Sequence, residues 1–448
     1  MTNLTEAVDR ELPRAVADLK RLVAIESISA DPERATEVQR SAETVAALLT
    51  DLGCPEVKIV SEGGQPAVIG HFPAPEGKPT ICLYAHHDVQ PTGEASLWTS
   101  PPFVPQQRGG RLFGRGIADD KGGLAVHLAA LRAFDGRPPV GVTVFIEGEE
   151  EVGSPSLGRI LWTYAAELAA DVYVIADSGN WEVGVPSFTT SLRGLADCIV
   201  EVKTLDHALH SGGFGGVAPD ALTSLCRLVA TLHDETGNVA VPGLVVTDGP
   251  DLEYPADRLK AESGVLDGVR YLGDGSVVQR LWTKPAISVL AIDATPVSKA
   301  SNTLAPRARA KISMRLAPGD RAGQALDRLT EHLITHAPYG AEVTVSRGDF
   351  SEPSSIGFEG QYADAARSAF AEAFATEPVY IGQGGSIPVV AEFADRFPDA
   401  TILVTAVCDP DSRMHGIDES LHLGDFGRAC HAEAGLIDRL GHAPGQPR

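Results

Sequence analysis

Residues 80–91 read T-I-C-L-Y-A-H-H-D-V-Q-P, an apolar run of strand length that ends in two histidines and an aspartate. Further apolar runs of strand length occupy 56–60, 67–72, 141–146 and 172–176, and each of them predicts a strand. Helical spacing of apolar residues occupies 8–23, 38–48, 123–134 and 157–170. Strands that alternate with helices predict an α/β fold, a mostly parallel sheet with helices on both faces.

The middle of the chain has a different pattern. From about Ser191 the strands alternate apolar and polar residues, which is typical of a sheet with one face in water. The order strand, helix, two strands, helix, strand, with a Gly-, Pro- and Asp-rich insertion before Thr283, predicts a compact antiparallel sheet with two helices. The sequence therefore predicts one α/β domain, formed by 1–190 and 349–448, that is interrupted by an α+β domain at 191–348.

Composition narrows the classes of partner. With 448 residues the chain is long enough for two domains, and its net charge of −23 argues against nucleic acid or an anionic membrane as partner. No uninterrupted apolar stretch reaches the length of about 18 residues that predicts a membrane span. The first twelve residues lack the apolar core of a signal peptide. Six scattered cysteines without C-x-x-C indicate reduced thiols, so a cytoplasmic location is expected.

Acidic and imidazole side chains gather where the expected strands end. They are His86-His87-Asp88, the segment E-G-E-E-E-V-G-S at 147–154, Asp177, the pair Asp119-Asp120 before a helix, and His415 late in the chain. If these ends share one edge of the sheet, the carboxylates repel one another unless protons or metal ions compensate them. Histidine with carboxylate and without cysteine suits Zn²⁺, Mn²⁺ or Co²⁺, so the sequence predicts a metal site.

Each of these motifs, taken alone, has another interpretation. A strand-end histidine or aspartate is commonly a surface residue, a glutamate run is commonly solvated, and an aspartate before a helix commonly caps it. Spacing does not choose between Asp119 and Asp120. The glycines at 114–123 do not form a nucleotide P-loop, and G-G-S-I-P at 384–388 lacks a serine-hydrolase elbow. The combination of all the strand-end groups favours the metal site.

The motifs resemble a known family. H-x-D-V-Q-P, G-R-G-x-x-D-D-K-G, E-G-x-E-E-x-G-S, a strand-end aspartate and a late histidine resemble the carnosinase, glutamate carboxypeptidase and acetylornithine deacetylase-like co-catalytic zinc metallopeptidases. G-G-S-I-P and the long insertion before Trp282 are similar to the cytosolic dipeptidase, carnosinase-like branch. The resemblance implies two Zn²⁺ per subunit, or Mn²⁺ or Co²⁺, on the larger, catalytic domain.

The resemblance also assigns roles to the strand-end residues. It implies that His86 and Asp177 bind one metal, that Glu151 and His415 bind the other, and that Asp119 bridges them. It implies further that Asp88 orients His86 and that Glu150 is the general base for a metal-activated water. His87 faces the other side of the extended chain and is expected to be structural.

Substrate contacts are implied on the inserted domain, which would act as a lid and in dimerisation. The segment D-H-A-L-H-S-G-G at 206–213 resembles the family's D-x-H-S-G with one extra residue. It implies that His210 donates to the oxyanion in a neighbouring subunit, hence a homodimer, although a loop histidine beside a glycine turn fits the same residues. Arg315, alternatively a surface arginine, matches the arginine that holds the substrate carboxylate. Further substrate contacts are implied for Asn302, Gly385 and Ser386.

The expected activity is metal-dependent hydrolysis of amide bonds in dipeptides or small peptides with a free carboxylate. The same site chemistry fits a deacylase of N-acyl or N-carbamoyl amino acids, so this activity stays open. G-Q-G-G-S-I-P at 382–388 replaces the family's R-E-G-G-S-I-P, which leaves the side-chain specificity open as well. A catalytically silent metal-binding protein would lack a ligand or the base, and the sequence lacks neither.

Overall fold

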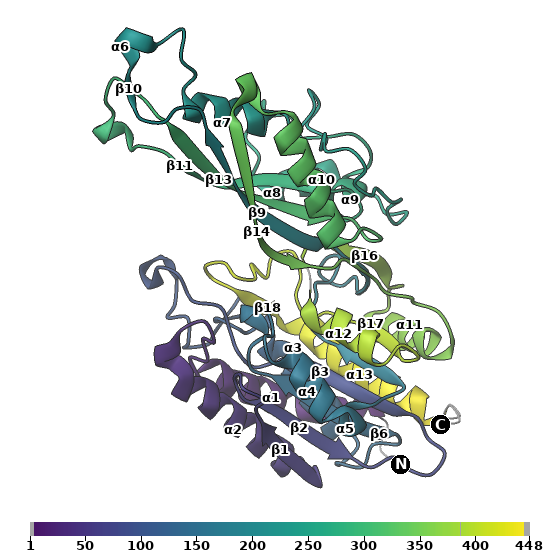
Figure 1. The fold of residues 1–448 in the computed structure, drawn as a ribbon. Helices are drawn as coiled ribbons and strands as arrows, with labels where there is room; N and C mark the ends of the chain where they lie inside the picture. Colours follow the sequence, from purple (N-terminus) through teal and green to yellow (C-terminus); the bar gives the residue numbers. More distant parts are fainter. Residues whose placement is uncertain (1–3, 386, 443–448) are drawn as a thin grey trace. The chain divides into compact units, whose positions relative to one another are not determined.

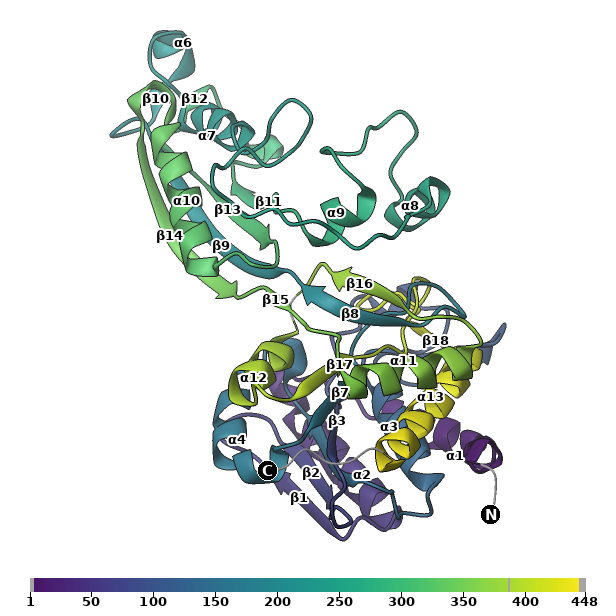
Figure 2. The ribbon, with the colours of Figure 1, turned by 90° about the vertical axis from the view of Figure 1, so that its right-hand side faces the viewer.

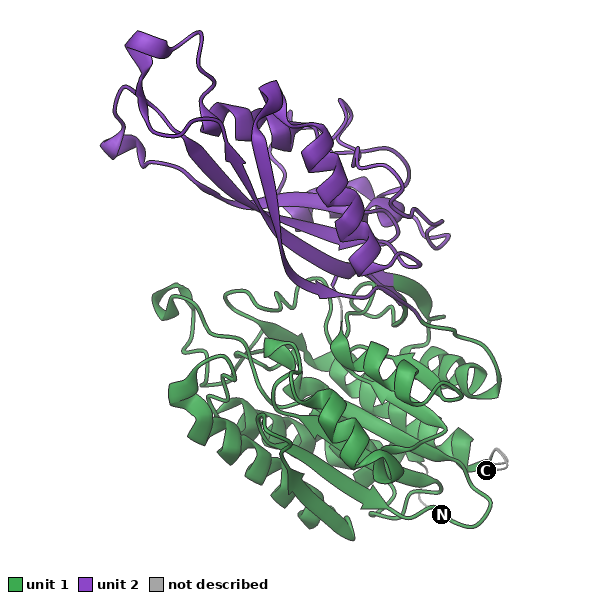
Figure 3. Ribbon diagram, viewed as in Figure 1, with its two compact units in different colours: residues 1–190, 356–381, 387–448 green, residues 191–355, 382–386 purple. Residues whose placement is uncertain are grey.

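The computed structural model describes residues 4–385 and 387–442, and the chain divides into two compact units (Figure 3). Unit 1 comprises 1–190, 356–381 and 387–448, and unit 2 comprises 191–355 and 382–386. The predicted boundary at 348 falls inside strand β14 (Glu342–Ser351). Beyond Val345 this strand carries mostly exposed residues and no longer alternates, so the sequence pattern stops before the strand does.

Four parallel strands form the centre of the unit 1 sheet. They pair in the order β6 (Gly141–Glu147), β3 (Thr80–His86), β7 (Val172–Ile175) and β17 (Thr401–Val404). Antiparallel strands flank them: β2 (Ala67–Phe72) and β1 (Glu56–Val60) on one side, and β8 (Ser187–Leu192) on the other, where β16 (Val379–Gln383) also pairs. The mostly parallel sheet that the sequence predicts is confirmed.

Helices cover both faces of this sheet (Figures 1 and 2). One face holds α1 (Leu4–Val23), α2 (Ala35–Asp51), α3 (Lys121–Arg132), α11 (Gln361–Phe374) and α13 (Leu423–His442); the other holds α4 (Leu157–Thr163), α5 (Ala165–Leu168) and α12 (Pro388–Arg396). Alternate strand residues supply the two cores. Leu83 and Val144 are buried in the core under the first group, whereas Tyr84 and Phe145 form an aromatic cluster with Phe393 of α12.

Unit 2 is an antiparallel sheet with two helices, as the sequence predicts. The strand order is β11 (Ala286–Asp293), β13 (Arg307–Leu316), β9 (Gly194–Lys203), β14. Helices α7 (Ala221–Ala230) and α10 (Ala322–Thr335) bury their apolar faces against β9 and β13. The insertion before Thr283 carries two short helices, α8 (Ala256–Ser263) and α9 (Val277–Trp282).

A small three-stranded sheet in unit 1 was not predicted. It has the order β18 (Ser420–His422), β5 (Arg111–Phe113), β4 (Gln106–Arg108). Strands of three residues are too short to produce a sequence period. The pairing of β5 with β18 joins two loops, 114–120 and 405–419, that lie far apart in the sequence. Within 4–385 and 387–442, no helix combines the length and apolar content needed to cross a bilayer.

Candidate metal centre

The polar strand ends of unit 1 meet at one edge of its sheet. Because β6, β3, β7 and β17 run parallel, their carboxyl ends lie on the same side, where α/β sheets bind ligands. His86 is the last residue of β3, Asp177 follows β7 by two residues, and Glu150 begins a short helical turn after β6. The convergence that the sequence predicts is therefore present.

Asp119 lies between two imidazoles. Its Oδ1 is 3.0 Å from His86 Nε2, and its Oδ2 is 2.9 Å from His415 Nε2. Asp120 is used differently, because its Oδ1 accepts from Gly123 N at 3.2 Å to cap α3 and its Oδ2 accepts from His86 N at 3.3 Å. Of this acidic pair, Asp119 is thus the member with one carboxylate oxygen toward each histidine.

Three further acids complete the cluster. Glu151 Oε2 lies 3.2 Å from His415 Nε2, and Asp177 Oδ1 lies 3.9 Å from His86 Nε2. Two groups have ligand atoms within 4.8 Å of one another and could each hold a metal ion: His86, Glu150 and Asp177, and His86, Asp119 and Glu151. Glu150 belongs to the first group, so position alone permits it to be a ligand or a base.

Protons compensate the crowded charges in the metal-free protein. Burial, with the neighbouring carboxylates, raises the pKa of Glu150 and of Asp177 well above their usual range. Hydrogen bonds with Asp119 and Glu151 raise the pKa of His415 to about 10. Burial opposes protonation of His86, but its carboxylate partners override burial and raise its pKa. Divalent cations would replace these protons, and the donor set of imidazole and carboxylate fits them.

Asp88 holds the residues around it. His86 Nδ1 is 3.1 Å from the Asp88 carbonyl and 3.4 Å from Oδ1, so residue 88 fixes the ring and turns Nε2 toward Asp119. The buried Asp88 carboxylate also accepts from Ser29 Oγ at 2.6 Å and from the backbone N–H groups of residues 150 and 151 at 3.2 and 3.1 Å. It therefore fixes both the histidine and the turn that follows β6.

His87 points away from the cluster, as expected for a structural residue. Its Nε2 donates to the Pro66 carbonyl at 2.8 Å. Burial lowers the pKa of His87 to about 4, so the ring is neutral near pH 7.

Several supporting residues were missed by the sequence reasoning. Gln90 donates from its backbone N and from Nε2 to the two oxygens of Glu151, at 3.1 and 2.8 Å. Ser29 holds Asp88, and Glu419 holds the loop of Asp119. Gln90 lies in the motif H-x-D-V-Q-P, and Glu419 lies four residues after His415, but residue type alone does not reveal their partners.

The remaining predicted residues belong to unit 2. His210 pairs with Thr303 in a two-stranded ribbon, and the Asn302 carbonyl accepts from Ser211 N at 2.9 Å, so residues 210 and 302 are neighbours. Gly385 lies in 382–386, and Ser386 lies outside the described residues. Their contacts with substrate stay predictions.

Arg315 of β13 has a cationic neighbour that the sequence reasoning did not identify. Burial, together with the Arg315 guanidinium, lowers the pKa of Arg193 to about 10. Arg193 is buried, and its Nη2 donates to the backbone carbonyls of Arg280 and Lys284, so its guanidinium is already bonded within unit 2.

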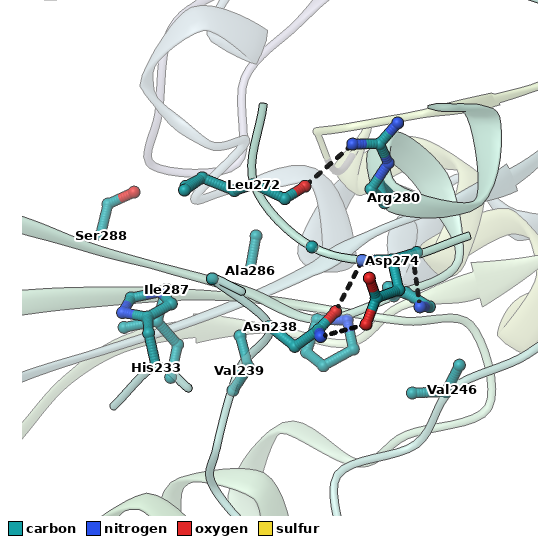
Figure 4. A pocket seen from close by; sticks show the side chains of 14 residues that line it. His233, Asn238, Val239, Val246, Leu272, Asp274, Arg280, Ala286, Ile287 and Ser288 are labelled. Atoms are coloured by element: carbon teal, nitrogen blue, oxygen red, sulfur yellow. Dashed lines mark hydrogen bonds between the residues drawn. The ribbon is translucent and has the colours of Figure 1, made fainter. Parts of the chain in front are cut away.

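A separate pocket of about 410 Å³ lies in unit 2 (Figure 4). Asn238 Nδ2 donates to Asp274 Oδ2 at 2.9 Å, and Arg280 Nη1 donates to the Leu272 carbonyl at 2.9 Å. These four lining residues are thus bonded to one another in pairs. Its described lining includes none of the predicted site residues.

Known proteins resemble this chain over its length. Residues 82–439 match the family described as "Peptidase family M20/M25/M40". A cysteinylglycine-S-conjugate dipeptidase of Corynebacterium striatum is 34% identical, over 97% of each chain, and a Cys-Gly metallodipeptidase of Schizosaccharomyces pombe is 26% identical over 95% of each. The crystal structure of human carnosine dipeptidase 1 superimposes with a TM-score of 0.81 at 25% identity, over 98% of each chain.

Proposed function

The chain belongs to peptidase family M20/M25/M40 and is a metallopeptidase, and from this premise we propose that it hydrolyses dipeptides or small peptides with a free carboxylate. The observation that carries the proposal is the Asp119 carboxylate, which faces His86 with one oxygen and His415 with the other, with the half-buried Glu150 in the same cluster. The names of the relatives above suggest cysteinylglycine, its S-conjugates and carnosine, which is β-alanyl-histidine, as substrates to test.

The same residues define two metal positions in this proposal. His86 and Asp177 would hold one ion, Glu151 and His415 the other, and Asp119 both. Two divalent ions there would acidify a water and polarise the amide carbonyl. We propose Zn²⁺ as the physiological ion, with Mn²⁺ and Co²⁺ as alternatives that metal analysis of the purified protein would distinguish, because imidazole and carboxylate ligands suit all three.

The chain's own groups would do the remaining work. Glu150 takes the proton of the attacking water and returns it to the leaving amine, while Asp88 holds the backbone of the turn that carries it. On unit 2, His210 donates to the oxyanion in the site of a neighbouring subunit, and Arg315 binds the substrate carboxylate. Asn302, Gly385 and Ser386 are proposed as further substrate contacts.

We also propose that the protein is a homodimer formed through unit 2. Strand β11 lies at the edge of its sheet and exposes Val289, Leu290 and Ile292, by 40%, 60% and 40%. An unpaired apolar edge is normally covered. We expect a dimer in sedimentation at micromolar concentration, and a shift toward monomer for Leu290→Lys. A wild type that sediments as a monomer would contradict the proposal.

We also propose a cytoplasmic location and the absence of nucleic-acid and membrane partners. All six cysteines are free, and five of them are buried, which suits a reducing cytoplasm; cell fractionation would test this. The net charge of −23 supports the absence of a nucleic-acid or anionic-membrane partner, which binding assays with DNA and anionic vesicles would check.

A substrate panel tests the activity directly. We expect amine release from cysteinylglycine, an S-conjugate of it or β-alanyl-histidine, loss of release with a chelator, and recovery with Zn²⁺ or Mn²⁺, because the water needs the ions for activation. N-acetyl, N-succinyl and N-carbamoyl amino acids serve as comparison substrates. Cleavage of these alone would keep the metal site but replace the dipeptidase by a deacylase. Inertness of the two-metal protein toward every compound would contradict both activities.

A further inference from the structure

Glu419 is a fully buried carboxylate whose acceptor sites are all used. Its Oε2 accepts from Arg115 Nη1 at 2.7 Å and from Gly116 N at 2.9 Å, and its Oε1 accepts from Ala118 N at 3.0 Å and Asp119 N at 3.2 Å. A carboxylate offers about four lone-pair sites, so no acceptor site is left over. Three of the four donors are backbone groups of the loop that carries Asp119.

Arg115 makes the return contact. This arginine, 2% exposed, donates from Nη2 to the Gly416 carbonyl at 3.0 Å. Gly416 follows His415 directly, and Glu419 lies four residues after His415. Each loop thus contributes one charged side chain that bonds to the backbone of the other loop, and the two charged groups also pair with each other.

The loop of His415 is also anchored elsewhere, because Asp418 accepts from Thr99 N at 2.9 Å and Asp409 accepts from Arg111 Nη2 at 2.8 Å. The His415 side chain is 56% exposed, and Arg413, His415 and Asp418 all have left-handed backbone conformations, with φ of 53°, 60° and 57°. Such conformations are uncommon for residues other than glycine and persist where surrounding contacts hold them. The buried contacts of Glu419 and Arg115 lie at the end of this segment, where β18 begins.

We propose that Glu419, with Arg115, is a positioning residue that holds Asp119 and His415 at the separation a metal ion between them requires. This inference rests on the proposed function, because it takes Asp119 and His415 as ligands. Side chains that orient metal ligands typically affect metal affinity or activity by about 10- to 100-fold. Glu419 acts here through the backbone of residues 116–119, without touching the ion.

Glu419→Gln tests this with little change of shape. The amide keeps one acceptor oxygen, but its NH₂ group faces donors, so the 114–120 loop loses half of its bonds to residue 419. In a competition titration with a chromophoric chelator, we expect the affinity for the second Zn²⁺ to fall by about 10- to 100-fold. The first Zn²⁺, between the strand-end residues His86 and Asp177, should be affected less. Glu419→Asp, which keeps the charge, should recover part of the affinity.

The matched control is Asp18→Asn, which breaks another ion pair of unit 1, between the half-buried Asp18 and the buried Arg132. Asp18 Oδ2 lies 2.7 Å from Arg132 Nη1, at the far end of α3 from Asp119. We expect this variant to bind both ions as the wild type does. Equal loss of the second ion in both variants would overturn the positioning role, since general destabilisation would explain it. Two ions bound with wild-type affinity by a folded Glu419→Gln variant would overturn it as well.

The wild type provides a test that needs no variant. In the metal-free protein the amide hydrogens of Gly116, Ala118 and Asp119 should exchange slowly with deuterium, since Glu419 binds them without a metal. Fast exchange of all three would overturn the inference even if the variants do not fold. The proposed function fails separately, if the wild type does not bind two ions or cleaves none of the dipeptides.

Discussion

Glu150→Gln is expected to lower kcat for the best dipeptide by about 10²- to 10⁴-fold, the range of general-base catalysis, while KM and metal content stay near those of the wild type. Glutamine has the size of glutamate but cannot take the proton of the attacking water. The backbone N–H of residue 150 would still donate to Asp88, so the turn should keep its shape.

The contrast with Glu151→Gln separates a base from a ligand. Glu151 Oε2 lies 3.2 Å from His415 Nε2, so its loss should release one ion, and excess metal should restore part of the activity. Excess metal should not restore Glu150→Gln. Steady-state kinetics measure the activity of each variant, and metal analysis after dialysis measures its bound ions. Glu150 also belongs to a group that could hold an ion. If the Glu150→Gln variant bound one ion fewer than the wild type, Glu150 would be a metal ligand, and its assignment as the general base would be wrong.

Much of the fold could be predicted because its signals are local. The strands β3, β6 and β7 are apolar runs bounded by polar residues, and their ends carry His86, Glu150 and Asp177. Parallel pairing then brings those ends together, and the alternation of apolar strand-length runs with helices in the sequence is enough to predict that pairing. The antiparallel sheet of unit 2 was predictable for the same reason, since β9 and β13 alternate apolar and polar residues along their length.

The supporting contacts of the site could not be predicted, because they join distant segments. Ser29 is 59 residues from Asp88, Gln90 is 61 from Glu151, and Glu419 is 300 from Asp119. A serine, a glutamine or a glutamate carries no sign of which backbone group it will meet. The ligand pairing came from family resemblance, and the spacing left Asp119 and Asp120 equivalent until the positions of their oxygens were known.

Asp119→Asn is expected to reduce kcat/KM by about 10³-fold or more, because a bound metal supplies several kcal/mol of transition-state stabilisation and this carboxylate faces both metal positions. An asparagine keeps one carbonyl oxygen but loses the charge and the second acceptor. One of the two metal positions would therefore lose its Asp119 oxygen, and we expect both ions to bind more weakly.

Asp120→Asn is the matched control, because it makes the same carboxyl-to-amide change in the adjacent residue. Its remaining carbonyl oxygen can still accept from Gly123 N and cap α3, and the bond that it loses is the 3.3 Å contact from His86 N, so we expect less than about a tenfold loss of activity and two retained ions. Metal content after dialysis and kcat/KM for the best dipeptide would be measured on both variants in parallel. If Asp120→Asn released the metals and Asp119→Asn kept them, Asp120 would be the bridging ligand, and the arrangement around His86 and His415 would have to be reassigned.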